Sequence, residues 1–225
     1  MIYYTKKSIF NMQTDAIVNT INCKGFMGKG IALEFSLRYP DLLTKYQQKC
    51  QKNEINIGKM FYYKTDNQII VNFPTKDDFK LPSQYDWIKK GIKDFKNTYK
   101  FHNIASIAFP PLGCGNGELN FNIVKKIIEE ELVMEPIDIY ICLDTNSAEG
   151  KELEMIKNFN DTRIEDFIDI IEIPKTQSTL LVKYQNKIKR FYEIQNIEGI
   201  GTTTYKKLHN YFYNYKIKLK QESLF

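Results

Sequence analysis

Short apolar runs alternate with amphipathic segments over the first two-thirds of the chain. The apolar runs are rich in β-branched residues and predict buried strands at 15–22, 59–64, 68–73, 104–109 and 137–142. The amphipathic segments predict helices at 31–38, 41–51, 84–98 and 121–132. Strands that alternate with helices in this way are typical of an α/β fold, with a sheet lying between helices on both faces.

The pattern changes near residue 146, so we expect a first domain at 1–145 and an accessory region at 146–225. In the second region, 164–173 predicts an acidic strand, whereas 177–193 and 202–219 predict helices. Residues 175–225 carry 10 Lys and Arg against 3 Asp and Glu. Such a basic region suits an acidic partner, but from charge alone a solvated helix surface is the preferred interpretation.

Composition excludes several classes of protein. No apolar stretch is long enough to cross a bilayer, so no membrane association is expected. The four cysteines lack CxxC spacing, which argues against a zinc site and a disulfide framework and favours the cytoplasm. Only two histidines occur, so a catalytic histidine pair is not expected. We therefore predict no metal and no cofactor.

Two glycine-rich segments, 25–30 and 110–117, each follow a predicted strand and precede a predicted helix. In open α/β sheets, ligands bind beyond the carboxyl ends of the strands, where helix N-termini and free N–H groups suit phosphate oxygens. Glycines there allow close approach of a diphosphate to the backbone. Neither segment matches a P-loop or a GxGxxG fingerprint, so tight turns remain an alternative.

The combination of motifs resembles the macrodomain family. It comprises DAIVNTIN at 15–22, GKGIA at 28–32 and PPLGCG at 110–115, and the resemblance covers residues 1 to about 145. Asn22-Cys23, MGKG at 27–30 and NFPTK at 72–76 resemble the branch that holds bacterial DNA ADP-ribosyl glycohydrolase (DarG-type) antitoxins and the human terminal ADP-ribose–protein glycohydrolase. The resemblance implies a macrodomain with a mixed β-sheet between helices, followed by a mainly helical C-terminal appendage.

The resemblance also implies an ADP-ribose site. Where many macrodomains have a Gly-Asp pair near the adenine, this chain has Lys7-Ser8. Asn22 would face the distal ribose, and the two glycine-rich loops would enclose the diphosphate. The implied binding residues are Ser8, Ile9, Thr20, Asn22, Met27, Gly28, Lys29, Gly30, Ile31, Thr75, Pro111, Leu112, Gly113, Cys114, Gly115, Asn116 and Gly117.

Lys76 matches the lysine to which catalysis is attributed in this branch. A lysine with a lowered pKa can attack an anomeric carbon. A protonated lysine can instead stabilise developing charge or act as a general acid. The residues alone do not choose between these roles, and apart from the resemblance a solvated loop lysine would be the simpler interpretation.

The resemblance favours removal of ADP-ribose from a DNA base, thymidine in single-stranded DNA, by an antitoxin whose residues 146–225 contact the cognate ADP-ribosyltransferase toxin. De-ADP-ribosylation of protein carboxylates and non-catalytic reading of ADP-ribose are the alternatives. The human relative has a catalytic aspartate where this chain has Gly117, which favours DNA. Neighbouring Glu118 is interpreted as a cap or dipole partner of the helix that follows.

Other residues near the predicted site have less specific interpretations. Phe79 and Tyr85 lie close to Lys76 in the sequence and are candidates for stacking an unpaired base. Trp87 is assigned to the core, and Cys23 and Cys114 are assigned to packing rather than to nucleophilic chemistry.

Overall fold

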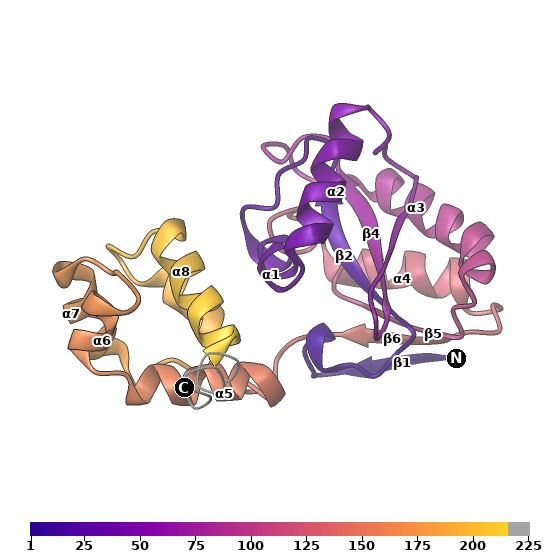
Figure 1. Cartoon of the computed structure of the whole chain (residues 1–225). Helices are drawn as coiled ribbons and strands as arrows, with labels where there is room; N and C mark the ends of the chain where they lie inside the picture. The colour runs from indigo at the N-terminus through magenta and orange to yellow at the C-terminus, as the bar shows by residue number, and fades with distance from the viewer. Residues whose placement is uncertain (216–225) are drawn as a thin grey trace. The chain divides into compact units, whose positions relative to one another are not determined.

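The chain divides into two compact units, Met1–Asn146 and Ser147–Phe225, and the computed structural model describes residues 1–215 (Figure 1). The first unit is built around a six-stranded sheet in the order β1-β6-β5-β2-β4-β3. Only the β3–β4 pair is antiparallel, so the sheet is mixed. Its strands are β1 (Ile2–Thr5), β2 (Ala16–Asn22), β3 (Phe61–Lys64), β4 (Ile69–Lys76), β5 (Ser106–Phe109) and β6 (Asp138–Cys142).

Helices cover both faces of this sheet (Figure 1). One face packs against α1 (Gly30–Arg38) and α2 (Pro40–Gln51). The other packs against α3 (Tyr85–Thr98) and α4 (Phe121–Leu132). Two short 3-10 helices, η1 (Ile9–Asn11) and η2 (Tyr99–His102), complete the unit. The predicted α/β architecture with a mixed sheet between helices is therefore confirmed.

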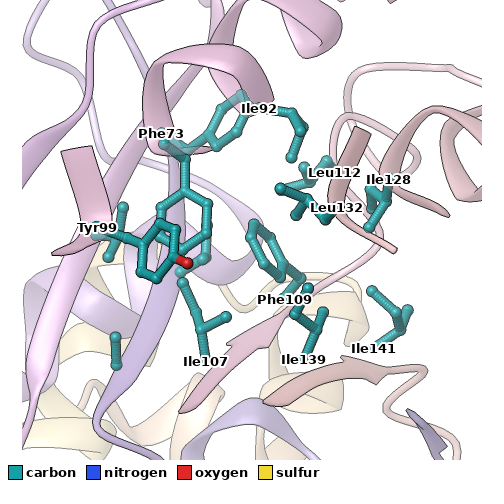
Figure 2. Close-up of a cluster of buried hydrophobic side chains, with 14 of the residues drawn as sticks. Phe73, Ile92, Tyr99, Ile107, Phe109, Leu112, Ile128, Leu132, Ile139 and Ile141 are labelled. Atoms are coloured by element: carbon teal, nitrogen blue, oxygen red, sulfur yellow. The ribbon is translucent and has the colours of Figure 1, made fainter. Parts of the chain in front are cut away.

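Alternating strand residues divide between the two faces, as a pleated strand requires. On β2, Ala16 and Val18 join the core under α3 and α4, whereas Ile17 packs on the opposite face. Figure 2 shows the larger core, in which Phe73 lies beneath α3. A Cβ at Gly91 of α3 would lie 2.2 Å from the Phe73 ring, so this glycine lets the helix approach β4 closely.

Most predicted elements of the first unit correspond to observed ones, with two differences. β1 has no counterpart among the predicted strands, because only four residues form it and two of them, Tyr3 and Tyr4, are exposed. β4 continues through Pro74 to Lys76, beyond the predicted end at residue 73. Pro74 is tolerated because β3 pairs with β4 only as far as Asn72, so no β3 partner needs its missing N–H.

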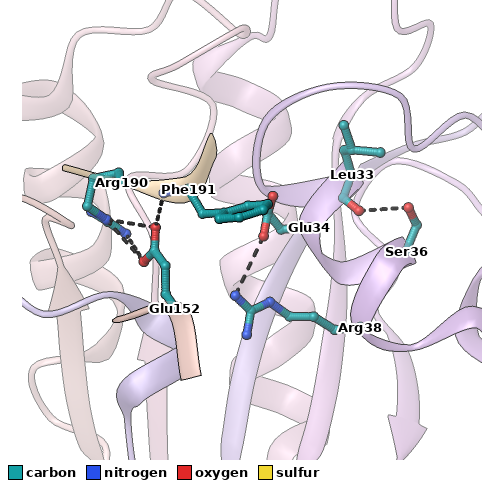
Figure 3. A network of polar contacts seen from close by, with 7 residues as sticks. All are labelled: Leu33, Glu34, Ser36, Arg38, Glu152, Arg190 and Phe191. Atoms are coloured by element: carbon teal, nitrogen blue, oxygen red, sulfur yellow. Dashed lines mark hydrogen bonds and ion pairs between the residues drawn. The ribbon is translucent and has the colours of Figure 1, made fainter. Parts of the chain in front are cut away.

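The second unit is helical over its described residues, which confirms the predicted helical appendage. Its elements are α5 (Gly150–Asp161), α6 (Ile164–Asp169), α7 (Lys175–Tyr184), the 3-10 helix η3 (Phe191–Asn196) and α8 (Thr202–Tyr213). Aromatic rings form its centre, including Phe159, Phe167 and Phe212, which meet edge to face. Glu152, buried, accepts hydrogen bonds from the Arg190 guanidinium and from the main-chain N–H of Phe191 (Figure 3).

Two predictions for this unit were wrong. Within residues 164–173, Ile164–Asp169 form the short helix α6 and the remainder is irregular, so no strand is present; Phe167 is the buried residue of this helix. The helix predicted at 177–193 ends at Tyr184, and η3 is a separate element. The last part of the predicted helix at 202–219 lies outside the described residues. Among residues 1–215, no helix is both long and apolar enough to cross a bilayer.

Candidate functional site around two glycine-rich loops and Lys76

The carboxyl ends of the parallel strands lie along one edge of the sheet, and most of the predicted site residues lie at these ends or in the segments that follow them. β2 ends at Asn22, β4 ends at Lys76 and β5 ends at Phe109. The first glycine-rich loop connects β2 to α1, and the second connects β5 to α4. Lys29 precedes α1 without a side-chain cap, which leaves the first N–H groups of this helix available to a phosphate.

The two loops meet at Asn116. The Lys76 Nζ donates a hydrogen bond to the main-chain oxygen of Asn116 at 2.6 Å. On the other side, the Asn116 amide nitrogen lies 2.9 Å from the position that a Cβ on Gly30 would occupy. Gly30 has a φ of +56°, a conformation that favours glycine. The end of β4 and both loops are thus brought together at one point, and Lys76 belongs to a strand end rather than to a solvated loop.

The first loop is held by the buried side chain of Asn22. Its amide nitrogen donates to the Phe26 oxygen at 2.6 Å, and its oxygen accepts from the N–H of Lys24 at 2.9 Å. The Tyr46 hydroxyl of α2 donates to the main-chain oxygen of Asn22 at 2.7 Å. Asn22 therefore organises its own loop, a role that the resemblance did not indicate; its contact with the distal ribose stays a prediction.

A main-chain link joins this loop to the end of β4. The N–H of Cys23 lies 3.1 Å from the oxygens of both Lys76 and Asp77. Because the link uses backbone atoms, it fixes where Lys76 leaves the sheet relative to the first loop.

The second loop depends on two crowded glycines and one open glycine. Gly113 has a φ of +68°. A Cβ on Gly117 would lie 2.4 Å from both the Gly113 oxygen and the Ser83 hydroxyl, so only glycine fits without a shift. Gly115, by contrast, is exposed and has nothing within 4 Å of its Cβ position. Its open face is the place where a bound group would find space.

The predicted binding residues differ in how much they offer a ligand. Ile9, Met27 and Leu112 are at most 4% exposed and pack in the core, so their side chains are not available and any nucleotide contact would use their backbones. Ser8 and Thr75 are also buried. The partly exposed members are Thr20, Gly28, Ile31, Pro111, Gly113 and Cys114, and the exposed ones are Lys29, Gly30, Gly115 and Asn116.

Gly28 serves a different purpose from the one expected. A Cβ there would lie 2.1 Å from the ring of Phe26, two residues earlier in the same loop. The missing side chain therefore accommodates the Phe26 ring. Phe26 is itself 49% exposed and was not among the predicted site residues, because an isolated phenylalanine in a glycine-rich segment carries no specific signal.

Burial keeps both loop cysteines protonated at neutral pH. Burial and the Asp77 carboxylate raise the pKa of Cys23 to about 11. Burial alone raises the pKa of Cys114 to about 11. A reactive cysteine needs a lowered pKa, so these thiols fit the packing role assigned to them.

Three neighbouring residues differ from their predicted roles. Glu118 does not cap α4: it has a φ of +64° and is exposed, whereas Asn120 caps the helix by accepting from the N–H of Asn122 at 2.9 Å. The Tyr85 hydroxyl accepts from the N–H of Asn120, and Tyr85 packs on the core, so it is not free to stack a base. Trp87 is half-buried rather than in the core, because α3 buries its other face.

Among residues 1–215, no group of three or more His, Cys, Asp or Glu side chains lies close enough together to hold a metal ion.

Known proteins share this arrangement. The Macro domain model matches residues 18–128. A DNA ADP-ribosyl glycohydrolase from Mycobacterium tuberculosis is 44% identical over 130 residues, which are 56% of this chain and 37% of that protein. The solved macrodomain of Mycobacterium tuberculosis DarG is 41% identical and superposes with a TM-score of 0.62, over 63% of this chain and 97% of that one.

A third relative joins two activities in one chain. It is a DNA ADP-ribosyl transferase–DNA ADP-ribosyl glycohydrolase fusion protein from Thermosipho africanus, 29% identical over 157 residues. That match covers 60% of this chain and 40% of the fusion protein, so this chain spans less than half the length of these curated relatives. With 97% of a solved macrodomain covered at 41% identity, and with the sheet order and loops described above, this chain belongs to the macrodomain family.

Proposed function

We propose that this chain binds ADP-ribose between its two glycine-rich loops and hydrolyses it from a DNA base, thymidine in single-stranded DNA. The observation that carries the proposal is the position of Lys76, whose Nζ lies where the two loops meet, 2.6 Å from the Asn116 oxygen. The similarity to a DNA ADP-ribosyl glycohydrolase from Mycobacterium tuberculosis at 44% identity supports the same activity.

The loops supply the groups that a nucleoside diphosphate needs. The uncapped N-terminus of α1 offers N–H donors and a partial positive charge to the phosphates. The open face of Gly115 gives the second loop room to close over the same group. Lys76 adds an amine beside both loops, where the glycosidic bond of a bound ADP-ribosyl group would lie.

Hydrolysis breaks the bond between the anomeric carbon and the base, and the base leaves with the bonding electrons. A protonated Lys76 stabilises that negative charge or donates a proton to it, whereas a neutral Lys76 attacks the anomeric carbon directly. Water then supplies the hydroxyl group of the released ADP-ribose in either case. The two roles differ in their response to arginine, which stays protonated and is a poor nucleophile.

A paired hydrolysis assay tests the proposal. The chain is incubated with a single-stranded oligonucleotide that carries ADP-ribosylated thymidine and, separately, with a protein that carries glutamate-linked ADP-ribose. We expect release of ADP-ribose from the DNA, at a rate that a chelator does not change. Release from the protein alone would assign the chain to carboxylate de-ADP-ribosylation, and binding without release from either would make it a reader.

We also propose that the second unit contacts a DNA ADP-ribosyltransferase, for which this chain is the antitoxin. The fusion of transferase and glycohydrolase in the relative from Thermosipho africanus supports an association between the two activities. The test is co-purification of the full chain with a DNA ADP-ribosyltransferase, for which the transferase part of the Thermosipho africanus fusion protein is one source, combined with growth of cells that express both. Loss of growth rescue in a catalytically inactive chain that still co-purifies would separate binding from hydrolysis.

A further inference from the structure

An exposed aromatic pair lies in the two segments that follow β2 and β4, which end at Asn22 and Lys76. Phe26 and Phe79 are 49% and 40% exposed, and their ring centroids are 4.6 Å apart with an interplanar angle of 41°. Leu81, in the same turn as Phe79, is 53% exposed. Large apolar side chains that gather at the surface in this way indicate a binding surface, because isolated exposure is common whereas clustering is not.

Both rings are carried by ordered segments rather than by free loops. The Phe26 backbone is fixed on both sides by the Asn22 side chain, which bonds its oxygen at 2.6 Å and lies 3.4 Å from its N–H. Phe79 lies in a turn that Asp78 holds together. The Asp78 carboxylate accepts a hydrogen bond from the N–H of Lys80 at 2.9 Å, and the Asp78 main-chain oxygen accepts one from the N–H of Leu81 at 3.1 Å. The pair is therefore preorganised, which lowers the entropic cost of binding a partner.

The charge around the rings suits a polyanion. Lys24, Lys29 and Lys80 are exposed beside the two aromatic segments, and the Lys80 Nζ lies 5.8 Å from the centroid of the Phe79 ring. Asp77 offsets part of this charge through its contact with Lys24 at 3.8 Å. Aromatic rings surrounded by lysines are the arrangement with which proteins bind single-stranded nucleic acid, because the rings stack bases and the lysines meet phosphates.

We propose that the Phe26–Phe79 pair stacks an unpaired nucleobase that neighbours the ADP-ribosylated base in single-stranded DNA. The inference rests on the proposed function and adds to it a second point of contact outside the ADP-ribose loops. In duplex DNA this base is stacked on its neighbours and is not available, so the pair selects single strands. Because stacking uses the face of a base, the selection is for strand state and length rather than for sequence.

The test compares substrates of different length with variants of Phe79. The substrates are the ADP-ribosylated thymidine nucleoside, a short single-stranded oligonucleotide carrying the same modification, and that oligonucleotide with an abasic site beside the modified base. The variants are Phe79→Ala, Phe79→Trp and, as a matched control, Phe101→Ala. Phe101 is 83% exposed and lies in η2, which precedes the amino end of β5, whereas Lys76 lies at the carboxyl end of β4.

For the wild type, we expect kcat/KM on the intact oligonucleotide to exceed that on the nucleoside by on the order of tenfold, the amount that one stacked base contributes. Phe79→Ala should lose this advantage and leave nucleoside hydrolysis unchanged. Phe79→Trp should keep it, and Phe101→Ala should behave as wild type. The abasic site should reduce wild-type activity by the same factor and should have no further effect in Phe79→Ala, since both changes remove one contact.

An equal rate on nucleoside and oligonucleotide in the wild type, or an unchanged length advantage in Phe79→Ala, would overturn the stacking proposal while leaving the proposed hydrolysis in place. Absence of hydrolysis on every DNA substrate would overturn the proposed function instead. In that case, anisotropy of an unmodified fluorescent oligonucleotide still decides the stacking question, because Phe79→Ala should weaken its binding by on the order of tenfold and Phe101→Ala should not. A preference for modified protein would assign the aromatic pair to a protein partner.

Discussion

The Lys76 Nζ and the main-chain oxygen of Asn116 are 2.6 Å apart, and this hydrogen bond joins the end of β4 to the second glycine-rich loop. A ligand bound between the loops would therefore meet a lysine whose position the backbone already sets.

Replacing Lys76 should separate binding from hydrolysis. Lys76→Ala is expected to bind ADP-ribose nearly as the wild type does, because the loops make most of the contacts, but to lose hydrolysis by on the order of a hundredfold or more. Calorimetric titration measures binding, and release of ADP-ribose from the modified oligonucleotide measures hydrolysis. Lys90→Ala, which removes an exposed lysine of α3, is the control. A wild-type rate in Lys76→Ala would remove this residue from the mechanism.

Lys76→Arg then distinguishes the two chemical roles. Partial recovery relative to Lys76→Ala indicates electrostatic stabilisation, since arginine retains the charge. No recovery is the result expected of a nucleophile. The same oligonucleotide assay gives the answer, with folding of each variant checked by thermal unfolding.

Gly115→Glu should weaken ADP-ribose binding without destabilising the fold. The Cβ position at Gly115 has nothing within 4 Å, so the new side chain fits, but its carboxylate would repel the diphosphate. Titration should show at least a tenfold weaker Kd at an unchanged Tm, an amount equal to about 1.4 kcal/mol. Gly201→Glu, at a similarly open glycine of the second unit, should bind as the wild type does. Unaltered affinity in Gly115→Glu would place the ligand elsewhere.

Gly117→Asp should not create a protein-directed enzyme. A Cβ at this position would lie 2.4 Å from the Gly113 oxygen, so the aspartate forces the second loop to move. Overpacking of this kind typically costs 1–3 kcal/mol, and urea unfolding should show a loss of about that size. Gly115→Ala is the matched change, because there a methyl group has room. A stable Gly117→Asp chain that releases glutamate-linked ADP-ribose would contradict this expectation.

Alkylation of the loop cysteines should depend on pH in a defined way. Because the pKa of both Cys23 and Cys114 is raised to about 11, their reaction with iodoacetamide should be slow near pH 8 and increase up to about pH 11, whereas an unfolded thiol levels off near its ordinary value. The raised values also mean that these protonated thiols stabilise the fold below the unfolded pKa and that this contribution is lost as the pH rises towards 11. Mass spectrometry of each peptide measures the rates. Loss of hydrolysis in Cys23→Ser or Cys114→Ser at full stability would point to a chemical role.

The sequence predicted the elements that carry a strong periodic signal and missed those that depend on tertiary context. The buried strands at β2, β5 and β6 and the amphipathic α3 and α4 follow directly from apolar spacing. β1 is too short and too exposed to stand out, and its partner is distant in the sequence. The strand predicted at 164–173 is absent, and its first six residues form the helix α6, because apolar residues at mixed spacing fit both elements until packing decides between them.

The candidate site shows the same division. The loop positions could be predicted because strand ends and glycines mark them in the sequence, whereas Lys76 could be predicted only because NFPTK at 72–76 resembles a macrodomain motif. The structural role of each glycine could not be predicted from the sequence. The missing side chain of Gly28 leaves room for the Phe26 ring, whereas that of Gly117 leaves room for the Gly113 oxygen and Ser83. The pairing of Phe26 with Phe79 also depends on two segments more than 50 residues apart, brought together by the link between Cys23 and Lys76.

The pairing of β1 with β6 constrains how the first unit is made. Ile2 of β1 pairs with Ile139 of β6, so the earliest strand to be synthesised acquires its partner only when the last strand of the unit has left the ribosome. Until then β1 has no strand to pair with in the nascent chain, and pairing between segments so far apart in the sequence is slow to form. Translation that pauses before residue 138 would therefore leave the two glycine-rich loops attached to an incomplete sheet, and the candidate site would be completed late in synthesis.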